Sequence, residues 1–240
     1  MAGTGVFQKR LLKALENIIG FYEKANNMMS LMTLKYVRSE SVKEFVKNES
    51  IRNKPVLDAG CGPGVMSMYL LSSLNRVKYL VGMDPIEKML LEYRKNLSAV
   101  SECIDCVRGV FEHPPFRDYS FGGVIVAFAI RDSVNILRAL YKLYNILCKG
   151  GCIFILELGK PYSKTIFREL LRIHFKITPV VVGAILDGAR GVANYRVLGE
   201  TYDKYPFTVK LYMFTRMIAG RCRCYYMLGG AVSVIIACRF

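Results

Sequence analysis

The spacing of apolar residues divides the chain into a helical start, an alternating middle and a second helical region. Residues 7–24 carry apolar side chains at helical spacing and end at the Asn26–Asn27 pair, which predicts one amphipathic N-terminal helix. From residue 54, short apolar runs alternate with helical stretches, a pattern typical of repeated βα units and a parallel sheet. We expect strands near 54–59, 78–83, 103–107, 122–128 and 152–158, with helices near 64–74, 85–97 and 131–148.

The pattern changes after Pro161. Helical spacing predicts three segments, at 163–175, 180–190 and 194–204, and two strands follow at 222–227 and 231–239 around a Gly229–Gly230 turn. The predicted fold class is therefore α/β: a Rossmann-like, doubly wound, mostly parallel seven-stranded sheet that ends in an antiparallel hairpin. Helices at the N-terminus and before the hairpin would cover the sheet.

Length and composition favour a single domain without a membrane span. A chain of 240 residues fits one large α/β domain. A membrane span needs about 20 consecutive apolar residues, and the apolar run Gly229–Cys238 has the length of a buried strand instead. The N-terminus lacks the pattern of a secretory signal, so we expect a cytoplasmic protein. Nothing in the sequence indicates an oligomeric state.

The net charge of +15 is concentrated at the C-terminal end, where residues 159–240 carry 13 basic and 4 acidic side chains. A basic face of this kind attracts nucleic acid or anionic lipid headgroups, but it is also compatible with an ordinary solvated surface.

The eight cysteines do not form a zinc-binding pattern. Cys103 and Cys106 form one C-x-x-C, and Cys222 and Cys224 form a C-x-C, without the second pair that a zinc site needs. We expect most cysteines to act as small hydrophobic residues, and we expect no metal.

The strongest motif is the run Val56–Gly64, in which an apolar strand leads into a glycine-rich turn that opens a helix. Its glycines are spaced G-x-G-x-G, whereas a dinucleotide fingerprint would need a glycine where Val65 stands. A carboxylate beside these glycines suits the ammonium and sulfonium groups of S-adenosylmethionine. We therefore predict that cofactor, with a ligand-free structural turn as the alternative. The expected cofactor contacts in the motif are Asp58, Ala59, Gly60, Cys61, Gly62 and Gly64.

A second acidic position supports the motif. Asp84 ends the next predicted strand about 20 residues after the glycines, where a carboxylate can accept both ribose hydroxyls. The alternative role of Asp84 is a helix N-cap. We include Pro85 and Met89, which follow Asp84, among the cofactor contacts.

With these motifs in place, the remaining chain resembles the ubiquinone and menaquinone biosynthesis C-methyltransferase family over nearly its whole length. The matching stretches keep the family's order: Tyr22–Glu23 and Asn27–Ser30 ("YD...N...S"), Phe128–Asp132 ("FGLRN"), Leu147–Gly151 ("LKPGG"), Leu156–Pro161 ("LEFSKP"), Tyr195–Pro206 ("YxYLxxSIxxFP") and Gly229–Ile236 ("GG...I"). The resemblance implies a class I methyltransferase with a cofactor-binding core over 51–160, a helical cover over 1–50, a lid over 161–210 and a closing hairpin over 211–240.

The resemblance also implies further contacts, and the chain departs from the family at three of its positions. Cofactor contacts are expected from Val110, Phe111 and Phe128, although Val110 stands where the family has an acid that contacts the adenine amino group. Gly122 likewise replaces an acid, and Asp132 replaces the asparagine that follows the family's arginine. These departures are compatible with a distant member that has another substrate.

Methyl transfer needs alignment more than catalytic groups, because the cofactor supplies the reactive carbon. Methylation of a quinol carbon also needs a phenolic proton weakened or removed. We expect Asp132 to do this, Arg131 to hold an oxyanion and His113 to lie near the ligand. The alternative for Asp132 is to satisfy first-turn N–H groups of a helix. The other histidine, His174, is expected to pack.

The expected acceptor is a small hydrophobic, prenylated quinol-like molecule. Residues 163–190 mix apolar and basic side chains as an interfacial helix does, which suits peripheral contact with a membrane. A lid over the protein's own pocket is the favoured alternative, and the two roles are compatible. Two other functions stay open: an RNA or protein methyltransferase that uses the basic C-terminal third, and a cofactor-binding protein without catalysis. Nucleic acid is thus the less favoured partner.

Overall fold

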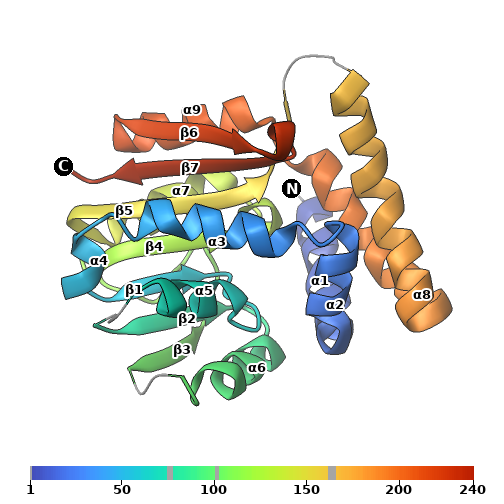
Figure 1. The fold of residues 1–240 in the computed structure, drawn as a ribbon, viewed down its shortest axis with the longest axis horizontal. Coiled ribbons are helices and arrows are strands. Elements are labelled where there is room, and N and C mark those ends of the chain that lie inside the picture. The colour runs from blue at the N-terminus through green and yellow to red at the C-terminus, as the bar shows by residue number, and fades with distance from the viewer. Residues whose placement is uncertain (1, 75–77, 101–102, 162–165) are drawn as a thin grey trace.

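The computed structural model describes residues 2–74, 78–100, 103–161 and 166–240, and it has a seven-stranded sheet at its centre (Figure 1). The strand order is β3-β2-β1-β4-β5-β7-β6. Strands β1 to β5 are parallel, and β7 runs antiparallel to both β5 and β6. The strands are β1 (Val56–Ala59), β2 (Leu80–Asp84), β3 (Ile104–Arg108), β4 (Phe121–Ala127), β5 (Leu147–Leu158), β6 (Cys222–Met227) and β7 (Val232–Cys238). The predicted α/β fold with a closing antiparallel hairpin is confirmed.

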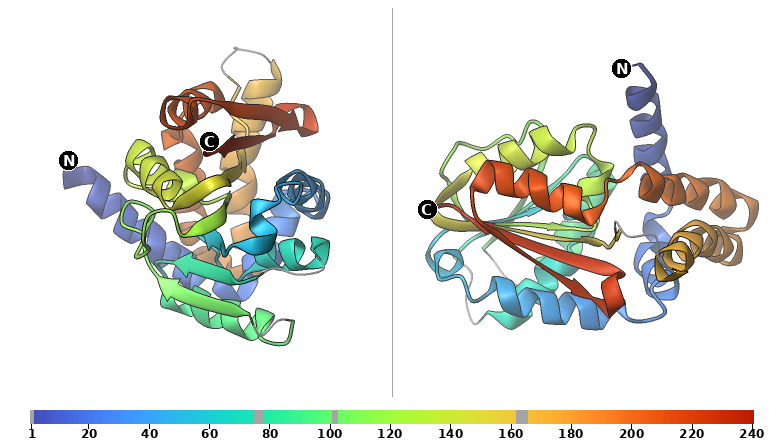
Figure 2. Two further views of the ribbon diagram at one scale, coloured as in Figure 1. Left: turned by 90° about the vertical axis from the view of Figure 1, so that its left-hand side faces the viewer. Right: turned by 90° about the horizontal axis from the view of Figure 1, so that it is seen from above.

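Helices cover both faces of the sheet (Figure 2). One face carries α3 (Leu34–Phe45), α4 (Ser50–Asn53), α5 (Val65–Ser73) and α6 (Glu87–Leu97), and the other carries α7 (Ile136–Asn145) and α9 (Thr208–Ala219). The central strands are apolar because both faces are covered: every residue of β1 and of Phe121–Val126 in β4 except two glycines and Asp58 is a buried apolar residue.

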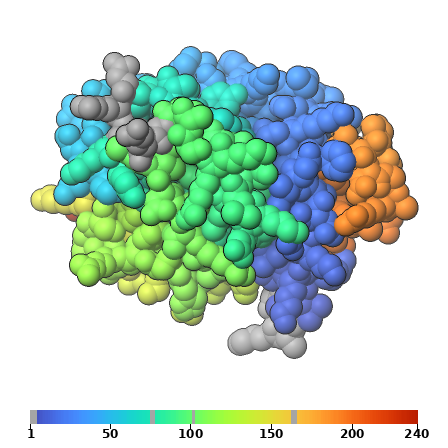
Figure 3. Space-filling model, turned by 90° about the horizontal axis from the view of Figure 1, so that it is seen from below, coloured from blue at the N-terminus to red at the C-terminus, as the bar shows by residue number. Residues whose placement is uncertain are grey.

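A second group of helices stands beyond the carboxyl ends of the parallel strands (Figure 1). It consists of α1 (Ala2–Asn17), the short 3-10 turn η1 (Ile19–Phe21), α2 (Tyr22–Met29) and α8 (Ile166–Lys204). Seen from below, α1 and α2 lie between the sheet core and α8 (Figure 3). Buried Ile18 and Ala25 pack against Val182 and Tyr195 of α8, so the N-terminal helices and α8 share a small core of their own.

Several predicted helix boundaries were wrong. The single helix expected over 7–24 is two helices, and Asn26 and Asn27 lie inside α2 instead of ending a helix. The helix expected over 131–148 begins at Ile136, because Asn135 caps it by accepting from the Arg138 amide; residues Ile130–Asp132 form a 3-10 turn, η2. Helix α9 occupies a stretch to which we assigned no element.

The three helices expected between 163 and 204 form one element, α8, whose only non-helical residues are Asp187 and Gly188 within the described 166–204. The chain reverses there because Gly188 has φ 54° and ψ −138°, a conformation that glycine alone adopts readily. The two arms then meet at Gly183 and Gly191, where a Cβ on Gly191 would lie 2.0 Å from the Gly183 carbonyl oxygen. The first predicted residues, 163–165, lie outside the described ranges.

Two cysteines are paired, as exceptions to the expectation that most cysteines act as small hydrophobic residues. Cys152 in β5 lies directly opposite Cys238 in β7, and the two form a disulfide. Among the described residues, no group of three or more His, Cys, Asp or Glu side chains is placed to hold a metal ion. Of the helices in these ranges, none is long and apolar enough to span a membrane.

Candidate active site

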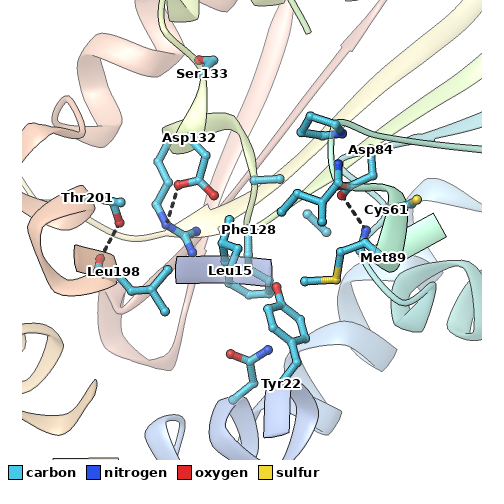
Figure 4. Close-up of a pocket in the computed structure, with 18 of the residues that line it drawn as sticks. Leu15, Tyr22, Cys61, Asp84, Met89, Phe128, Asp132, Ser133, Leu198 and Thr201 are labelled. Atoms are coloured by element: carbon cyan, nitrogen blue, oxygen red, sulfur yellow. Dashed lines mark hydrogen bonds and ion pairs between the residues drawn. The ribbon is translucent and has the colours of Figure 1, made fainter. Parts of the chain in front are cut away.

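A cavity of about 650 Å³ opens at the carboxyl ends of β1, β2 and β4 and is roofed by α1, α2 and α8. Ligands of open α/β sheets bind at this edge, outside the carboxyl ends of the strands. The cavity has two sides: the glycine turn and Asp84 form one, and η2 with the arms of α8 forms the other (Figure 4).

The glycine turn follows β1 and is fixed by the neighbouring strand. The amides of Gly60 and Cys61 both donate to the Met83 carbonyl, at 2.7 and 3.1 Å. Gly60 and Gly62 have φ values of 71° and 51°, which disfavour residues with a Cβ. A Cβ on Gly62 would meet nothing within 4 Å, so the space beside this backbone is open. The turn therefore offers bare backbone to a ligand.

Asp84 lies against this turn and is 7% exposed. Its Oδ2 accepts from the Gly62 amide at 3.1 Å, and its Oδ1 accepts from the Ile86 amide at 2.9 Å. Burial raises the pKa of Asp84 to about 6, while the two amide hydrogen bonds lower it. The N-cap of α6 is Ile86, whose own side chain makes no cap hydrogen bond, so Asp84 is not the N-cap and links the glycine turn to the start of the helix.

Asp58 is the second carboxylate on this side. It is 1% exposed, and its Oδ2 accepts from the Ser67 hydroxyl at 2.7 Å. Burial raises its pKa to about 6, Ser67 lowers it, and the nearby charge of Asp84 raises it further. Two buried carboxylates with raised pKa values at the edge of one cavity suit a ligand with positive charge.

Most of the predicted cofactor contacts lie together around the cavity. Its lining includes Asp58, Gly60, Cys61, Gly62, Asp84, Pro85, Met89, Val110, Phe111 and Phe128. Ala59 packs in the core of the sheet instead, and Gly64 starts α5 with φ 87°, packed against Tyr93 and Leu97. Ala59 and Gly64 thus shape the strand and the turn from behind.

Two of the departures from the family motif, Val110 and Gly122, lie in different places. Val110 lines the cavity with a side chain that cannot accept a hydrogen bond. Gly122 lies at the amino end of β4, away from the cavity, and a Cβ there would stand 2.3 Å from the Ser50 carbonyl oxygen. An acid at Gly122 would therefore collide with α4, and its loss has no bearing on cofactor binding.

Arg131 and Asp132 belong to a buried charged cluster that includes Glu157 of β5. Arg131 Nη1 donates to Glu157 Oε1 at 2.6 Å, and Arg131 Nε lies 3.8 Å from Asp132 Oδ1. Within the described part of the chain, Asp132 Oδ1 has no hydrogen-bond partner. Burial raises the pKa of Asp132 to about 7, while Arg131 lowers it and Glu157 raises it. The Arg131 guanidinium thus faces two carboxylates, and it hydrogen-bonds to that of Glu157 but not to that of Asp132.

The cap role considered for Asp132 is wrong, because Asn135 caps α7. Sequence analysis also missed Glu157 as the main partner of Arg131. Its position in the "LEFSKP"-like stretch was the available signal, but only the parallel pairing of β4 and β5 places it beside η2.

The two histidines occupy different parts of the cavity wall. His113 Nε2 accepts from Arg138 Nη2 at 3.1 Å on the exposed rim. His174, expected only to pack, also lines the cavity: its Nε2 donates to the Met29 carbonyl at 2.9 Å, and its Nδ1 lies 3.1 Å from the Thr178 hydroxyl. His174 therefore joins α8 to the end of α2.

The roof of the cavity combines an apolar surface with polar side chains, among them the tyrosines Tyr22 and Tyr202. Its apolar side chains come from three helices: Leu12, Leu15, Ile18, Met29, Phe175 and Leu198. Tyr22 points from α2 toward the space between Phe128 and Met89 (Figure 4), and burial raises the pKa of its hydroxyl. The roof thus offers an apolar surface next to the charged cluster at η2.

Comparisons with known proteins agree with this geometry. Residues 4–238 match the model of the ubiE/COQ5 methyltransferase family. The demethylmenaquinone methyltransferase of Staphylococcus saprophyticus is 28% identical over 212 residues, covering 88% of each chain. That of Staphylococcus aureus strain MRSA252 is 26% identical over 206 residues, covering 86% of this chain and 83% of the relative.

Solved structures show the same fold at low identity. A SAM-dependent methyltransferase from Thermotoga maritima superposes with a TM-score of 0.65 at 18% identity, over 96% of this chain and 100% of that one. A SAM-dependent methyltransferase from Aquifex aeolicus gives a TM-score of 0.57 at 12% identity, over 89% and 97%.

The residues of the cavity fit S-adenosylmethionine, since bare glycine backbone and two buried carboxylates, Asp58 and Asp84, line it. The family match covers nearly the whole chain. The chain therefore belongs to the ubiE/COQ5 methyltransferase family and is a SAM-dependent methyltransferase.

Proposed function

We propose that this enzyme methylates a ring carbon of a small hydrophobic, prenylated quinol-like acceptor. The observation that carries the proposal is the composition of the cavity, in which a polar cofactor side continues into an apolar roof beside the Arg131–Asp132–Glu157 cluster. The names of the Staphylococcus relatives support a quinol-type acceptor. A polar acceptor such as a nucleotide would leave the apolar roof without a partner.

The residues on the cofactor side of the cavity would bind and orient the cofactor. Asp84 would accept the ribose hydroxyls, Asp58 would stabilise positive charge, and the backbone at Gly60–Gly62 allows close approach. The bound cofactor supplies an activated methyl group on its sulfonium. Met89, Val110, Phe111 and Phe128 would exclude water from the transfer.

The cluster at η2 would act on the acceptor. Asp132 would take a phenolic proton, because its Oδ1 has no hydrogen-bond partner in the described residues and its raised pKa lies near neutral pH. Arg131, held by Glu157, would then stabilise the phenolate oxygen with its remaining N–H groups. His113 lies on the rim, where it would contact the ligand at the entrance.

The test is calorimetric titration with S-adenosylmethionine and S-adenosylhomocysteine, followed by methyl-transfer assays with prenylated quinols and with RNA. We expect binding by the wild type and its loss in Asp84→Ala and Gly62→Arg, because the first removes the ribose acceptor and the second fills the open space at Gly62. Asp118→Ala and Gly20→Arg, at exposed positions away from these contacts, are the matched controls.

The results distinguish the proposed function from its alternatives. Cofactor binding with methylation of the quinol supports the proposal, and methylation of RNA alone would overturn the proposed acceptor. Binding without any product would instead indicate a non-catalytic protein.

For localisation we propose a cytoplasmic protein that contacts a membrane at its periphery.

A further inference from the structure

The first arm of α8 carries an exposed apolar stripe. Ile166, Leu170, Ile173, Ile177 and Val181 recur at intervals of three and four residues, and between 49% and 83% of each is exposed. Residues at this spacing share one side of a helix. The opposite side of the arm packs inward, with Leu171 and Val182 buried. The stripe therefore faces away from the protein at its outer edge, where α8 stands in Figure 1.

A neighbouring turn extends the apolar surface. Leu31 and Met32, between α2 and α3, are 73% and 62% exposed, and both have positive φ, 50° and 63°. Such values are uncommon for large side chains. The turn is held by backbone bonds from Leu31 to Met28 and from Met32 to Asn27. It lies beside α8, because His174 donates to the carbonyl of Met29.

Basic side chains form a second row along the same arm. Arg168, Arg172 and Lys176 are four residues apart, so they share one side of the helix, which is turned away from the stripe toward the second arm, where Arg172 and Lys176 meet Asp203. Glu169 pairs with Arg168 and Arg172, and Asp203 pairs with Arg172 and Lys176. A helix that exposes an apolar row and carries basic side chains on another side has the pattern of a helix that lies in a membrane interface.

The surface is continuous with the active-site cavity. The cavity lining includes Met29, Ser30 and Leu34 on one side and His174, Phe175 and Thr178 on the other. These residues flank the exposed turn and alternate with the exposed Ile173 and Ile177 along α8. An apolar acceptor that left a hydrophobic phase at this surface would meet the wall of the cavity where His174 joins α8 to α2.

We infer that the α8 stripe and the Leu31–Met32 turn form a docking surface for the interface of a bilayer that contains anionic lipids. The occupant is a bilayer because the basic row and the net charge of +15 complement anionic headgroups, and because a second copy would bring the same basic rows together. The part of the inference that concerns acceptor entry rests on the proposed function, whereas the docking surface itself does not.

The experiment is flotation of the full-length protein with phosphatidylcholine vesicles, with or without about one-third phosphatidylglycerol. We expect binding to the anionic vesicles and at least about tenfold weaker partitioning of Ile173→Glu/Ile177→Glu, because two charges then face the acyl region. The matched control is Leu91→Glu/Met217→Glu, which changes two similarly exposed apolar residues on α6 and α9. The control should bind like the wild type.

The basic row has its own pair of variants. Arg172→Gln/Lys176→Gln should weaken binding to the anionic vesicles, whereas Lys43→Gln/Lys47→Gln, at exposed ion pairs in α3 and just after it, should not. Equal losses in a test pair and its control would contradict the surface, as would binding of the wild type to neither vesicle. Self-association that the Ile173→Glu/Ile177→Glu pair abolishes, without vesicle binding, would assign the stripe to a second copy instead.

Cofactor binding and methyl transfer to a short-chain, water-soluble quinol separate this inference from the proposed function. Both should be unchanged in Ile173→Glu/Ile177→Glu, since neither residue lines the cavity. Methyl transfer without vesicle binding would overturn the docking surface alone. Vesicle binding without any methyl transfer would overturn the proposed function alone.

Discussion

The two carboxylates at the cofactor side give binding a definite pH dependence. Asp58 and Asp84 have pKa values raised to about 6 by burial, so both become partly protonated as the pH falls through that value. A cationic cofactor favours the ionised forms and must displace the protons. We predict that affinity for S-adenosylmethionine weakens by about tenfold per pH unit for each proton displaced below pH 6. Calorimetry from about pH 5 to pH 8 measures this dependence, and a flat profile would contradict it.

The same raised pKa values act on stability in the opposite direction. A carboxyl whose pKa is higher in the folded than in the unfolded protein stabilises the fold at low pH, and that contribution is lost as the pH rises through the folded value. For the ligand-free enzyme, Asp58, Asp84 and Asp132 should therefore favour a higher Tm near pH 5 than near pH 8. Bound cofactor, which favours the ionised carboxylates, should therefore reduce this difference in Tm between pH 5 and pH 8.

Asp132 gives a test of the proton-transfer role at the level of one side chain. The resembled family has asparagine at this position, so Asp132→Asn tests a base that is particular to this chain: it keeps the shape and removes the carboxylate, and we predict that kcat falls by about 100-fold or more while the Kd of the cofactor stays unchanged. The rise of kcat through about pH 7 should disappear with it. Glu157→Gln is the comparison, since it should misplace Arg131 but leave the Asp132 titration in the pH profile. Wild-type kcat in Asp132→Asn would exclude Asp132 as the base.

Sequence analysis identified most of these residues where a local motif carried the signal. The glycine turn and Asp84 were predictable because strand, turn and acid follow one another in the chain. Glu157 was missed, and Gly122 was interpreted as a loss near the cofactor. Both depend on which strands pair and on which helix lies beneath, and spacing along the chain does not contain that information.

At the level of elements, the strands were predicted well and the helices of the roof poorly. Short apolar runs between turn signals mark buried strands directly. Breaks in the roof were placed near Thr178, Pro179 and Gly191 because proline and glycine usually end helices. Tertiary packing overrides that preference here: Pro179 is buried inside α8, and Gly191 is needed where the two arms cross.

The crossing of the α8 arms makes a prediction about the lid. Gly191→Ala places a Cβ 2.0 Å from the Gly183 carbonyl oxygen and should force the arms apart, at a cost of about 1–3 kcal/mol in stability. Because both arms line the cavity, we expect KM for the acceptor to rise while cofactor affinity is kept. Gly199→Ala is the control on the same helix: its Cβ meets nothing closer than 3.6 Å, so it should be neutral or slightly stabilising. Equal effects of the two would show that the crossing does not shape the lid.

For the whole molecule, the Cys152–Cys238 disulfide joins the parallel half of the sheet to the closing hairpin. It bridges directly opposed residues of β5 and β7 across 86 positions of sequence. Closing a loop of that size removes conformations from the unfolded chain and is worth about 4 kcal/mol. The pairing could not be predicted from the sequence, because it requires the register of two strands on either side of α8 and α9.

Removing the link therefore gives a prediction for the stability of the whole domain. Cys238→Ser should lower Tm by about 10 °C in the oxidised protein, since the sheet edge keeps its hydrogen bonds but the unfolded chain regains its freedom. Cys148→Ser, at a free cysteine in the same strand, should change Tm little. Adding a reductant should bring the wild type down to the Tm of Cys238→Ser and leave that variant where it was. The disulfide lies at the end of the sheet far from Asp84 and Asp132. Cofactor affinity below the melting range should therefore be the same in the oxidised and the reduced protein. A loss of affinity on reduction would show that the hairpin positions the cavity.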